Sequence, residues 1–437
     1  MANRDMLAHL LRRATFGPTA AEVDAAVRDG LDATLDRLLR PVGSDRGAAA
    51  TPPPRLGPDP AASLGRKPAR EQRQEANQQR GAQVRQVLEW WLDRMVAADH
   101  QLGEKLLFFW HGHWATSVKK VKSAQLMLGQ LNTLRRYGPG PFGDLVTAMV
   151  RDPALIVWLD GQKNTRQAPN ENLARELMEL FTLGIGNYTE ADVKAGARAL
   201  TGWTIDRGTG AATFVPRRHD PGDKTILGRT AAFDAESYAR LLADRPEAAA
   251  FVATRLWFRF AGGATPAQPT AAPGQPAHPD STAVLRAVLT SPAFGATAGQ
   301  LVKQPVEWAV GAMRQLGIRP SALPEQQRRQ LVSGLDGLDQ VPLRPPSVGG
   351  WPAGTAWLTT GALQARMRLA QLFAARMAPT VGRALAAAPQ PGRLDALARL
   401  LVVDAWTQRS RAALAPLAAD PPRLVAAALV SPEYTVS

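Results

Sequence analysis

The chain has 437 residues, of which 45% are hydrophobic and 21% charged; it carries a formal net charge of +14 and contains no cysteine. This composition is typical of a folded globular protein, and the lack of cysteine excludes disulfide bonds and thiolate metal sites. No segment approaches the roughly 18 apolar residues that cross a bilayer, and the N-terminus lacks the apolar core of a signal peptide, so we expect a soluble, cytoplasmic protein without a membrane span.

The first elements that the sequence predicts are helices bounded by turn residues. In the segment GPTAAEVDAAVRDG, Thr19 and Glu22 have the spacing of a capping box, and Gly30 ends the predicted helix. Residues 51–70, which follow, are rich in Pro, Gly and Ala and offer little apolar surface to bury. We predict that this segment is a flexible surface insertion.

A histidine pair lies in the aromatic segment LLFFWHGHWATS, residues 106–117. In a helix, His111 and His113 would point about 200° apart, so they could not ligate one ion from the same face. His113 follows the apolar positions of the helix, whereas His111 points away from them unless Gly112 breaks the helix. Two interpretations remain: a metal site that needs a third ligand from elsewhere, or a buried histidine with one hydrogen-bond partner.

Basic residues gather only weakly along the chain. The densest group is Lys119, Lys120 and Lys122, with Arg135 and Arg136 further on. A basic excess can attract nucleic acid, but most of the arginines are scattered, which favours an ordinary solvated surface. We predict that the protein does not bind nucleic acid sequence-specifically.

The segment APNENLARELMELFTLGIG, residues 168–186, predicts a helix with one apolar and one polar side. Its polar side covers an arc of about 140° and carries Glu171, Asn172, Arg175, Glu176 and Glu179. This arc can be a solvated face with i,i+4 ion pairs or an inward-facing polar network, and the sequence supports the two interpretations equally. A later loop, RRHDPGDKTILG, offers a further His and Asp among turn residues, where functional side chains are often held.

Three segments share one construction, in which an apolar helix runs into Asp-Pro or Ser-Pro: residues 145–156, 283–295 and 424–436. The Asp or Ser can cap a new turn, and Pro is tolerated at the first position of that turn. Convincing alternating strands are absent, so the predicted fold is all-α, one large multi-helical unit over residues 1–437. Residues 262–280 are a second predicted flexible insertion, whereas two tryptophans make residues 341–357 an ordered loop.

Six motifs occur in the order found in a large bacterial family: HLLRRATFGPTAAEV, FWHGHWATS, WLDGQKNTRQAPNENLARELMELFTLGIGNYTEADVKAGARALTGW, HDPGDKTILG, PPSVGGWPAG and SPEYTVS. On these motifs the chain resembles the domain of unknown function 1800 family from about Leu7 to the C-terminus. The resemblance implies no activity, because none is established for that family. Gly112 and Ser347 stand where relatives commonly have Asn, so any ligand contact made by those Asn side chains would be lost.

The resemblance also implies a partner. Similar proteins often lie beside a gene for an exported protein of the domain of unknown function 1501 family, which would be the first partner to test. Export together with such a partner would change the expected location.

Two functions remain open. In the first, Phe109, Trp110 and Trp114 wall a polar pocket that binds a small ligand or a divalent metal, with carboxylates and imidazoles as general acids and bases or as metal ligands. In the second, the protein is a non-enzymatic binding or assembly partner whose polar network is structural. We favour the pocket slightly.

If the protein has such a pocket, we expect His113, the Glu176 and Glu179 side of the polar arc, and His219 to line it together. The catalytic candidates are Glu176, Glu179 and His219. The candidates for binding a divalent metal are His113, Glu176 and His219. The ligand-binding candidates are His111, His113, Asn170, Glu171, Asn172, Arg175, Asp220, Lys224 and Trp203.

Overall fold

The computed structural model of the protein describes residues 4–437 apart from residues 42, 44, 66, 207 and 263–279. Most of the described residues are helical, and two small two-stranded sheets are the exceptions. The expected helical fold is therefore confirmed in its main feature, and the two hairpins correct the stricter expectation of an all-α chain.

The described residues up to Asp160 are mostly helical, and the longest connection lies between α4 and α5. Their bounds are α1 (Arg4–Ala14), α2 (Ala20–Asp29), α3 (Leu31–Leu39), α4 (Arg46–Ala49), α5 (Arg70–Ala97), α6 (Gln101–His113), α7 (Val118–Val121), α8 (Ala124–Tyr137), α9 (Phe142–Met149) and α10 (Pro153–Trp158).

The next hundred residues contain the two hairpins. The elements are η1 (Gly161–Lys163), α11 (Asn172–Glu176), the π-helix η2 (Leu177–Thr182), α12 (Glu190–Ala199), β1 (Trp203–Ile205), β2 (Ala212–Phe214), η3 (Pro216–Arg218), β3 (Lys224–Ile226), β4 (Arg229–Ala231), α13 (Ala235–Ala243) and α14 (Pro246–Phe260). Strands β3 and β4 are joined by Leu227 and Gly228, both with positive φ. A two-residue turn of this kind matches the twist of antiparallel strands, which explains this hairpin in a helical protein.

The C-terminal part is again helical. Its elements are α15 (Ser281–Thr290), α16 (Pro292–Gly295), α17 (Pro305–Gln315), η4 (Pro320–Ala322), α18 (Glu325–Asp336), η5 (Gly354–Trp357), α19 (Thr360–Ala375), α20 (Pro379–Ala387), η6 (Gln390–Gly392), α21 (Arg393–Leu401), α22 (Gln408–Leu414), η7 (Ala415–Leu417), α23 (Pro421–Leu429) and α24 (Pro432–Thr435). None of the described helices is both long and apolar enough to cross a membrane.

Helix starts follow the caps that the sequence predicts. Thr19 and Glu22 form the expected capping box at α2, each bonding to the other's backbone N–H. The three Pro-containing corners are also confirmed, since a side-chain oxygen caps the new helix and Pro occupies its first turn at each of them. The capping residues are Asp152, Ser291 and Ser431. These starts are local, because the cap and the groups it bonds lie within three residues.

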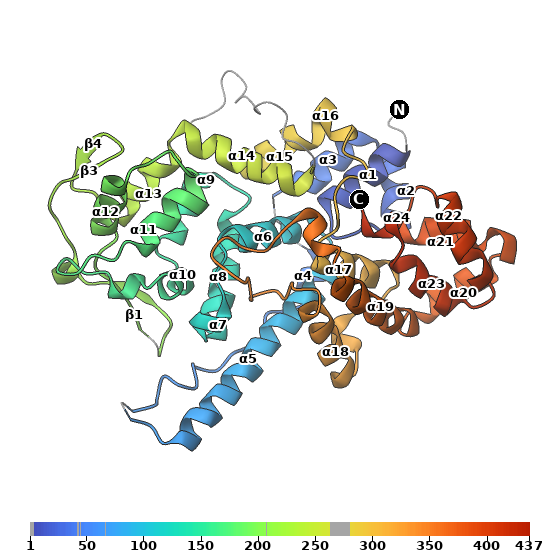
Figure 1. Cartoon of the computed structure of the whole chain (residues 1–437), viewed down its shortest axis with the longest axis horizontal. Coiled ribbons are helices and arrows are strands. Elements are labelled where there is room, and N and C mark those ends of the chain that lie inside the picture. Colours follow the sequence, from blue (N-terminus) through green and yellow to red (C-terminus); the bar gives the residue numbers. More distant parts are fainter. Residues whose placement is uncertain (1–3, 42, 44, 66, 207, 263–279) are drawn as a thin grey trace.

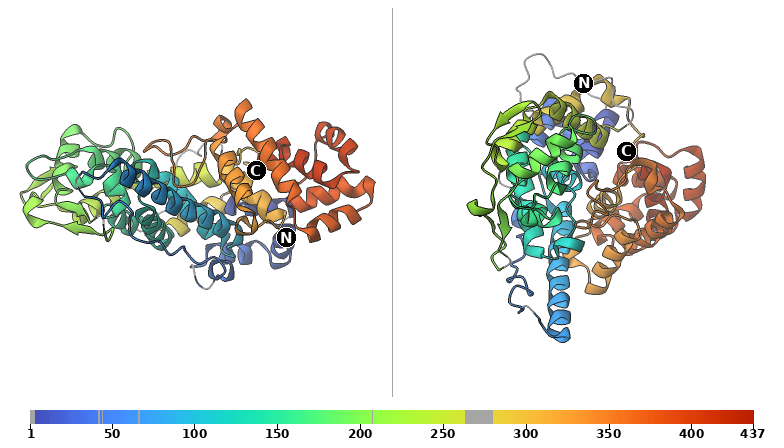
Figure 2. Two further views of the ribbon diagram at one scale, coloured as in Figure 1. Left: turned by 90° about the horizontal axis from the view of Figure 1, so that it is seen from below. Right: turned by 60° about the vertical axis from the view of Figure 1, so that its left-hand side comes forward.

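The molecule is elongated, and α6 lies near its middle (Figures 1 and 2). The hairpins and α10–α13 occupy one end, and α20–α23 occupy the other (Figure 1). Helices α1, α3, α5 and α8 all contact α6. The buried apolar residues form one contiguous cluster that reaches from Leu7 to Tyr434. Helix α6 therefore has protein around it on several sides, and this position buries both of its histidines.

The predicted insertion 51–70 leads into α5, whose first turns project from the body (Figures 1 and 2). Asp59 accepts two hydrogen bonds of 2.6 Å from Arg80, and the indole of Trp90 donates to the carbonyl of Thr51 at 2.9 Å. Its described residues therefore pack along α5, while its flexibility stays a prediction. Most of the second insertion, residues 263–279 of the predicted 262–280, lies outside the described residues.

Candidate functional site

The histidine helix α6 runs unbroken to His113, and both of its imidazoles are buried. Because the helix is unbroken, His111 lies on the opposite side of α6 from His113, as expected, but that side is buried as well. Aromatic residues occupy neighbouring positions of α6, including Phe108 and Phe109, and neighbours cover the helix all round. The 200° between the two imidazoles therefore separates two buried environments rather than a buried face and an exposed one.

His113 holds the polar-arc segment through a single hydrogen bond. Its Nε2 lies 2.9 Å from the carbonyl oxygen of Phe181, and since a carbonyl only accepts, Nε2 carries the proton. Burial, and then the charge of Arg255, lower the pKa of His113 to about 3. The imidazole is therefore neutral at pH 7, and its Nδ1 has no hydrogen-bond partner among the described residues.

His111 holds a different segment. Its Nε2 accepts a 3.0 Å hydrogen bond from the backbone N–H of Leu343, a residue at φ +68. Burial lowers the pKa of His111 to about 3, so this imidazole is also neutral. Because its acceptor nitrogen is already used by the backbone, His111 serves to fasten the loop that ends in η5.

That loop continues along α6 in a contact between two glycines. A Cβ placed on Gly350 would lie 2.4 Å from the carbonyl oxygen of Gly112, and Gly350 has φ +85. Trp351 then stacks on Phe108, with ring centroids 5.8 Å apart. The predicted ordered loop thus packs its Trp351 against the aromatic helix, and only glycine at position 350 allows so close an approach.

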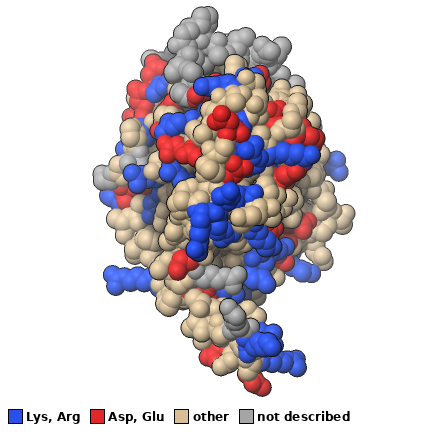
Figure 3. Space-filling model, turned by 90° about the vertical axis from the view of Figure 1, so that its left-hand side faces the viewer, with Lys and Arg blue, Asp and Glu red and all other residues tan. Residues whose placement is uncertain are grey.

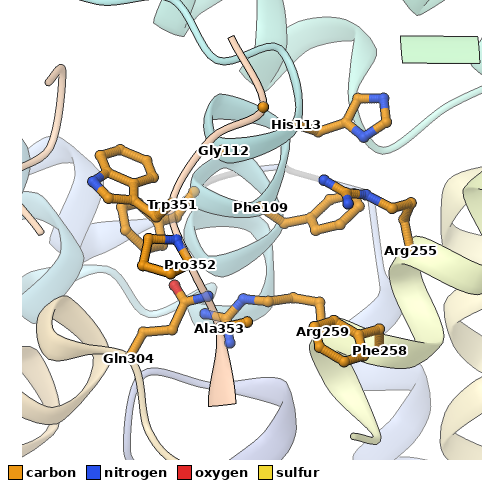
Figure 4. A pocket seen from close by; sticks show the side chains of 12 residues that line it. Phe109, Gly112, His113, Arg255, Phe258, Arg259, Gln304, Trp351, Pro352 and Ala353 are labelled. Atoms are coloured by element: carbon orange, nitrogen blue, oxygen red, sulfur yellow. The ribbon is translucent and has the colours of Figure 1, made fainter. Parts of the chain in front are cut away.

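A pocket of about 120 Å³ lies between α6, α14 and this loop (Figure 4). Aromatic rings and the backbone of the loop form much of its wall, and the polar groups come from a histidine, two arginines and a glutamine. The lining residues are Phe108, Phe109, Gly112, His113, Arg255, Phe258, Arg259, Gln304, Gly349, Trp351, Pro352 and Ala353.

The two arginines point from α14 into this pocket (Figure 4). Arg255 is half-buried, and among the described residues its guanidinium has no hydrogen-bonded or ionic partner. Burial lowers the pKa of Arg255, and no carboxylate opposes that effect. Arg259 is only 8% exposed; its Nη1 donates to Glu307 at 3.0 Å, while its Nη2 lacks a partner within the described structure.

Behind the pocket, several cations surround one carboxylate. Glu307 is buried between Lys105 and Arg259, and it is paired with both. Burial alone would raise the pKa of Glu307, but these two charges outweigh it and lower the pKa to about 2. Lys303 is also buried here, and burial and then the charge of Arg12 lower its pKa to about 7. The inner wall of the pocket is therefore electropositive.

The polar arc of α11 and η2 lies at the surface. Arg175 bonds bidentately to Glu190, at 2.6 and 2.7 Å, and also to Glu171 at 3.1 Å. Glu179 accepts a 2.6 Å hydrogen bond from the hydroxyl of Tyr188, and both it and Glu176 are half-buried. Burial, and then the charge of Glu179, raise the pKa of Glu176.

The asparagines of this segment stabilise its entry turn. The backbone N–H of Asn170 donates to the buried Asn164 side chain at 2.9 Å, and Asn172 donates through its backbone to Asn170 at 3.1 Å. The π-helix follows at Leu177–Thr182, and it includes Phe181, whose carbonyl meets the imidazole of α6. A π-turn is uncommon and often accompanies a functional site.

His219, Asp220 and Lys224 form a separate group near β1. His219 Nδ1 lies 3.1 Å from both the hydroxyl and the carbonyl oxygen of Thr201. Asp220 pairs with Arg198 at 2.6 Å, while Lys224 donates to the carbonyl of Asp220 at 2.7 Å. These contacts close the loop on itself.

The sequence-derived candidates therefore fall into different surroundings. Only His113 among them lines the pocket, whose wall does not include Glu176, Glu179 or His219. Trp203, in β1, packs against Phe214 with ring centroids 5.5 Å apart. Among the described residues, no three His, Asp or Glu side chains are grouped so that they could hold a metal ion, so the three metal candidates do not form such a group.

The sequence analysis missed the two arginines of the pocket. They occur in FVATRLWFRF, where Arg255 and Arg259 are spaced i,i+4 in an otherwise apolar helix. Charged side chains are rarely placed among apolar residues without a structural or functional cause, so the spacing of these two arginines could have indicated the pocket.

Comparison with known proteins places nearly the whole chain in one family. Residues 9–436 match the family described as "Protein of unknown function (DUF1800)". No curated protein and no solved structure matches the chain. Since the match spans almost every residue of the fold described above, the chain belongs to the DUF1800 family.

Proposed function

We propose that the protein binds a small anionic molecule in the pocket between α6, α14 and the loop at residues 349–353. The observation that carries this proposal is Arg255, a half-buried guanidinium in the pocket wall without an anionic partner among the described residues. A guanidinium removed from water costs free energy unless a carboxylate or phosphate group satisfies its charge and its donors.

Two neighbouring groups support the same ligand. Arg259 contributes a second guanidinium, one face of which is already held by Glu307. The side-chain oxygen of Gln304 accepts a hydrogen bond from Gln340 at 3.0 Å, which leaves its NH₂ group as a donor at the pocket. Donors and positive charge thus dominate the polar part of the wall, as an anion requires.

Size and wall chemistry limit what can enter. A cavity of about 120 Å³ is smaller than the roughly 150 Å³ that accommodates benzene. A carboxylate or phosphate group fits this volume, and the rings of Phe109, Phe258 and Trp351 would contact an apolar portion of the ligand. A divalent cation is disfavoured, because no carboxylate lines the pocket and two guanidinium groups would repel it.

Titration calorimetry with phosphate, sulfate, acetate and propionate tests the proposal. Arg255→Gln is the decisive variant, since within the described structure it breaks no hydrogen bond or ion pair and loses only the contact of the guanidinium with the ring of Phe251, and we expect it to weaken binding about tenfold or more. Gly112→Leu is a second variant: a Cβ there is 3.7 Å from Trp351, so a longer side chain would fill the cavity. Both variants should keep the wild-type melting temperature within a few degrees.

Arg28→Gln is the matched control, because Arg28 is an exposed helical arginine that does not line the pocket. Binding of none of the four anions, or equal binding by the wild type and Arg255→Gln, would show that the pocket is not an anion site. Saturable binding of Zn²⁺ or Mg²⁺ in place of the anions would contradict the proposal and favour a divalent-metal site.

A further inference from the structure

A second positively charged feature lies on the half of the molecule that carries the hairpins (Figure 1), along the neighbouring segments α7, η1 and η3. Its cations come from α7, η1, η3 and the turn after η1, and we call them the basic end face: Lys119, Lys120, Lys122, Lys163, Arg166, Arg217 and Arg218. Six of the seven are exposed, and Arg218 is half-buried. Figure 3 shows a group of lysines and arginines in the middle of the view from this end, with acidic side chains mostly above it.

Hydrogen bonds hold the segments of the basic end face together. The backbone N–H of Arg166 donates to the carbonyl of Arg218 at 2.8 Å, and the Arg218 guanidinium donates to the carbonyl of Gln162 at 2.7 Å. Asp160 joins Lys120 and Lys163, at 2.8 and 2.9 Å. Within the described part of the chain, Asp160 is the single carboxylate that pairs with these seven cations, so most of their charge is unneutralised.

We propose that the basic end face docks on the surface of an anionic lipid bilayer. Clusters of four to eight Lys and Arg residues are attracted to anionic headgroups, and long Lys and Arg stems can lie along the interface while their charges reach the headgroups. Phe214, which is 40% exposed, neighbours this face through His219, with ring centroids 5.3 Å apart. An aromatic ring beside a basic cluster can enter the headgroup region.

The geometry favours a bilayer over a nucleic acid. The cations sit on elements of three or four residues, and α7, η1 and η3 are each too short to serve as a recognition helix in a DNA groove. The segments that carry them are neighbours, since α10 contacts both α7 and η1 and the backbone of Arg166 bonds to that of Arg218, so a broad anionic surface can meet several of the cations at once.

Vesicle co-sedimentation of the full chain tests this docking. The vesicles are made of phosphatidylcholine alone, or of phosphatidylcholine with about 30% phosphatidylglycerol. We expect binding to the anionic vesicles only, with a loss at 0.5 M salt, where the Debye length is roughly 4 Å. The triple variant Lys163→Glu, Arg166→Glu, Arg217→Glu should reduce the partition coefficient at least about tenfold.

The matched control reverses three exposed arginines elsewhere, as Arg28→Glu, Arg409→Glu and Arg423→Glu, and so changes net charge equally. Retained binding by this control supports a local site, while an equal loss in both triples would reduce the effect to net charge and overturn the proposal. Absence of binding to the anionic vesicles would also overturn it. So would tighter, end-face-dependent binding to a single-stranded oligonucleotide, which would make the face a nucleic-acid site.

Discussion

Two clusters in this protein use the same chemical groups in opposite environments. Around Glu307, one carboxylate lies between Lys105 and Arg259, and all three side chains are buried. Around Arg175, one guanidinium lies between Glu171 and Glu190, and all three side chains are at least one-third exposed. Burial therefore decides how much free energy depends on each pairing, because water can replace a lost partner only at the surface.

The largest effect is expected for Glu307→Gln. This change leaves Lys105 and Arg259 without their shared carboxylate in the core, and we expect unfolding free energy to fall by about 3–5 kcal/mol. Urea unfolding at pH 7 measures the loss. Glu190→Gln is the surface counterpart and should change the unfolding free energy far less, because water can replace the lost partner there. Equal losses for the two variants would contradict the comparison.

Acid should destabilise the protein through its buried histidines. His111 and His113 have folded-state pKa values lowered to about 3 by burial, against an unfolded value of about 6.5. Their stabilising contribution is therefore complete above pH 6.5 and is lost as pH falls from 6.5 towards 3. At pH 5 the two groups together should lower unfolding free energy by about 4 kcal/mol relative to pH 7.5.

The same measurement on a variant separates these histidines from other acid-sensitive groups. His113→Gln can keep the hydrogen bond to the carbonyl of Phe181 without an imidazole that charges in the unfolded chain. Both proteins should lose unfolding free energy between pH 7.5 and 5. The variant should lose less than the wild type, by about half of the effect expected for the two histidines together. An unchanged pH profile would show that His113 is not buried as a neutral group.

A buried carboxylate without a cation should behave in the opposite way. Burial raises the pKa of Asp152 to about 6, although hydrogen bonds from Leu155 and Gln130 oppose that shift. Its folded-state pKa exceeds the unfolded value, so its contribution is fully favourable below about pH 3.9 and declines as pH rises through 6. Asp152→Asn, which keeps a capping oxygen, should gain about 1–3 kcal/mol at pH 8 and nothing at pH 4. A loss at pH 8 would contradict this.

The smallest effect is expected at the polar arc. Burial and Glu179 raise the pKa of Glu176, but the side chain is half-exposed, so solvent screening weakens the repulsion. Glu176→Gln should leave stability unchanged or raise it by about 0.5 kcal/mol at pH 7. Thermal melts with and without divalent metal measure this, and destabilisation by more than about 1 kcal/mol would give the arc a structural role.

The sequence predicted the local features of this molecule better than the distant ones. The capping box of Thr19 and Glu22 and the Asp-Pro and Ser-Pro corners involve contacts only between residues a few positions apart. Their spacing in the sequence was therefore sufficient to predict them. The pocket was not predictable in this way, because Arg255 reaches α6 from a helix about 140 residues away along the chain. Periodicity placed His111 on the side of α6 opposite His113 but could not show that this side is buried too, because neighbours cover this helix all round.

The two hydrogen bonds of the α6 imidazoles have a consequence for synthesis of the protein. His113 holds Phe181, and His111 holds Leu343, so one short helix joins segments separated by about 160 residues of chain. A growing polypeptide has no complete pocket until residue 353 has left the ribosome, because the last wall begins at Gly349. Contacts over such sequence distances form late in folding. The proposed anion binding thus becomes available only to a chain of which four-fifths has been synthesised.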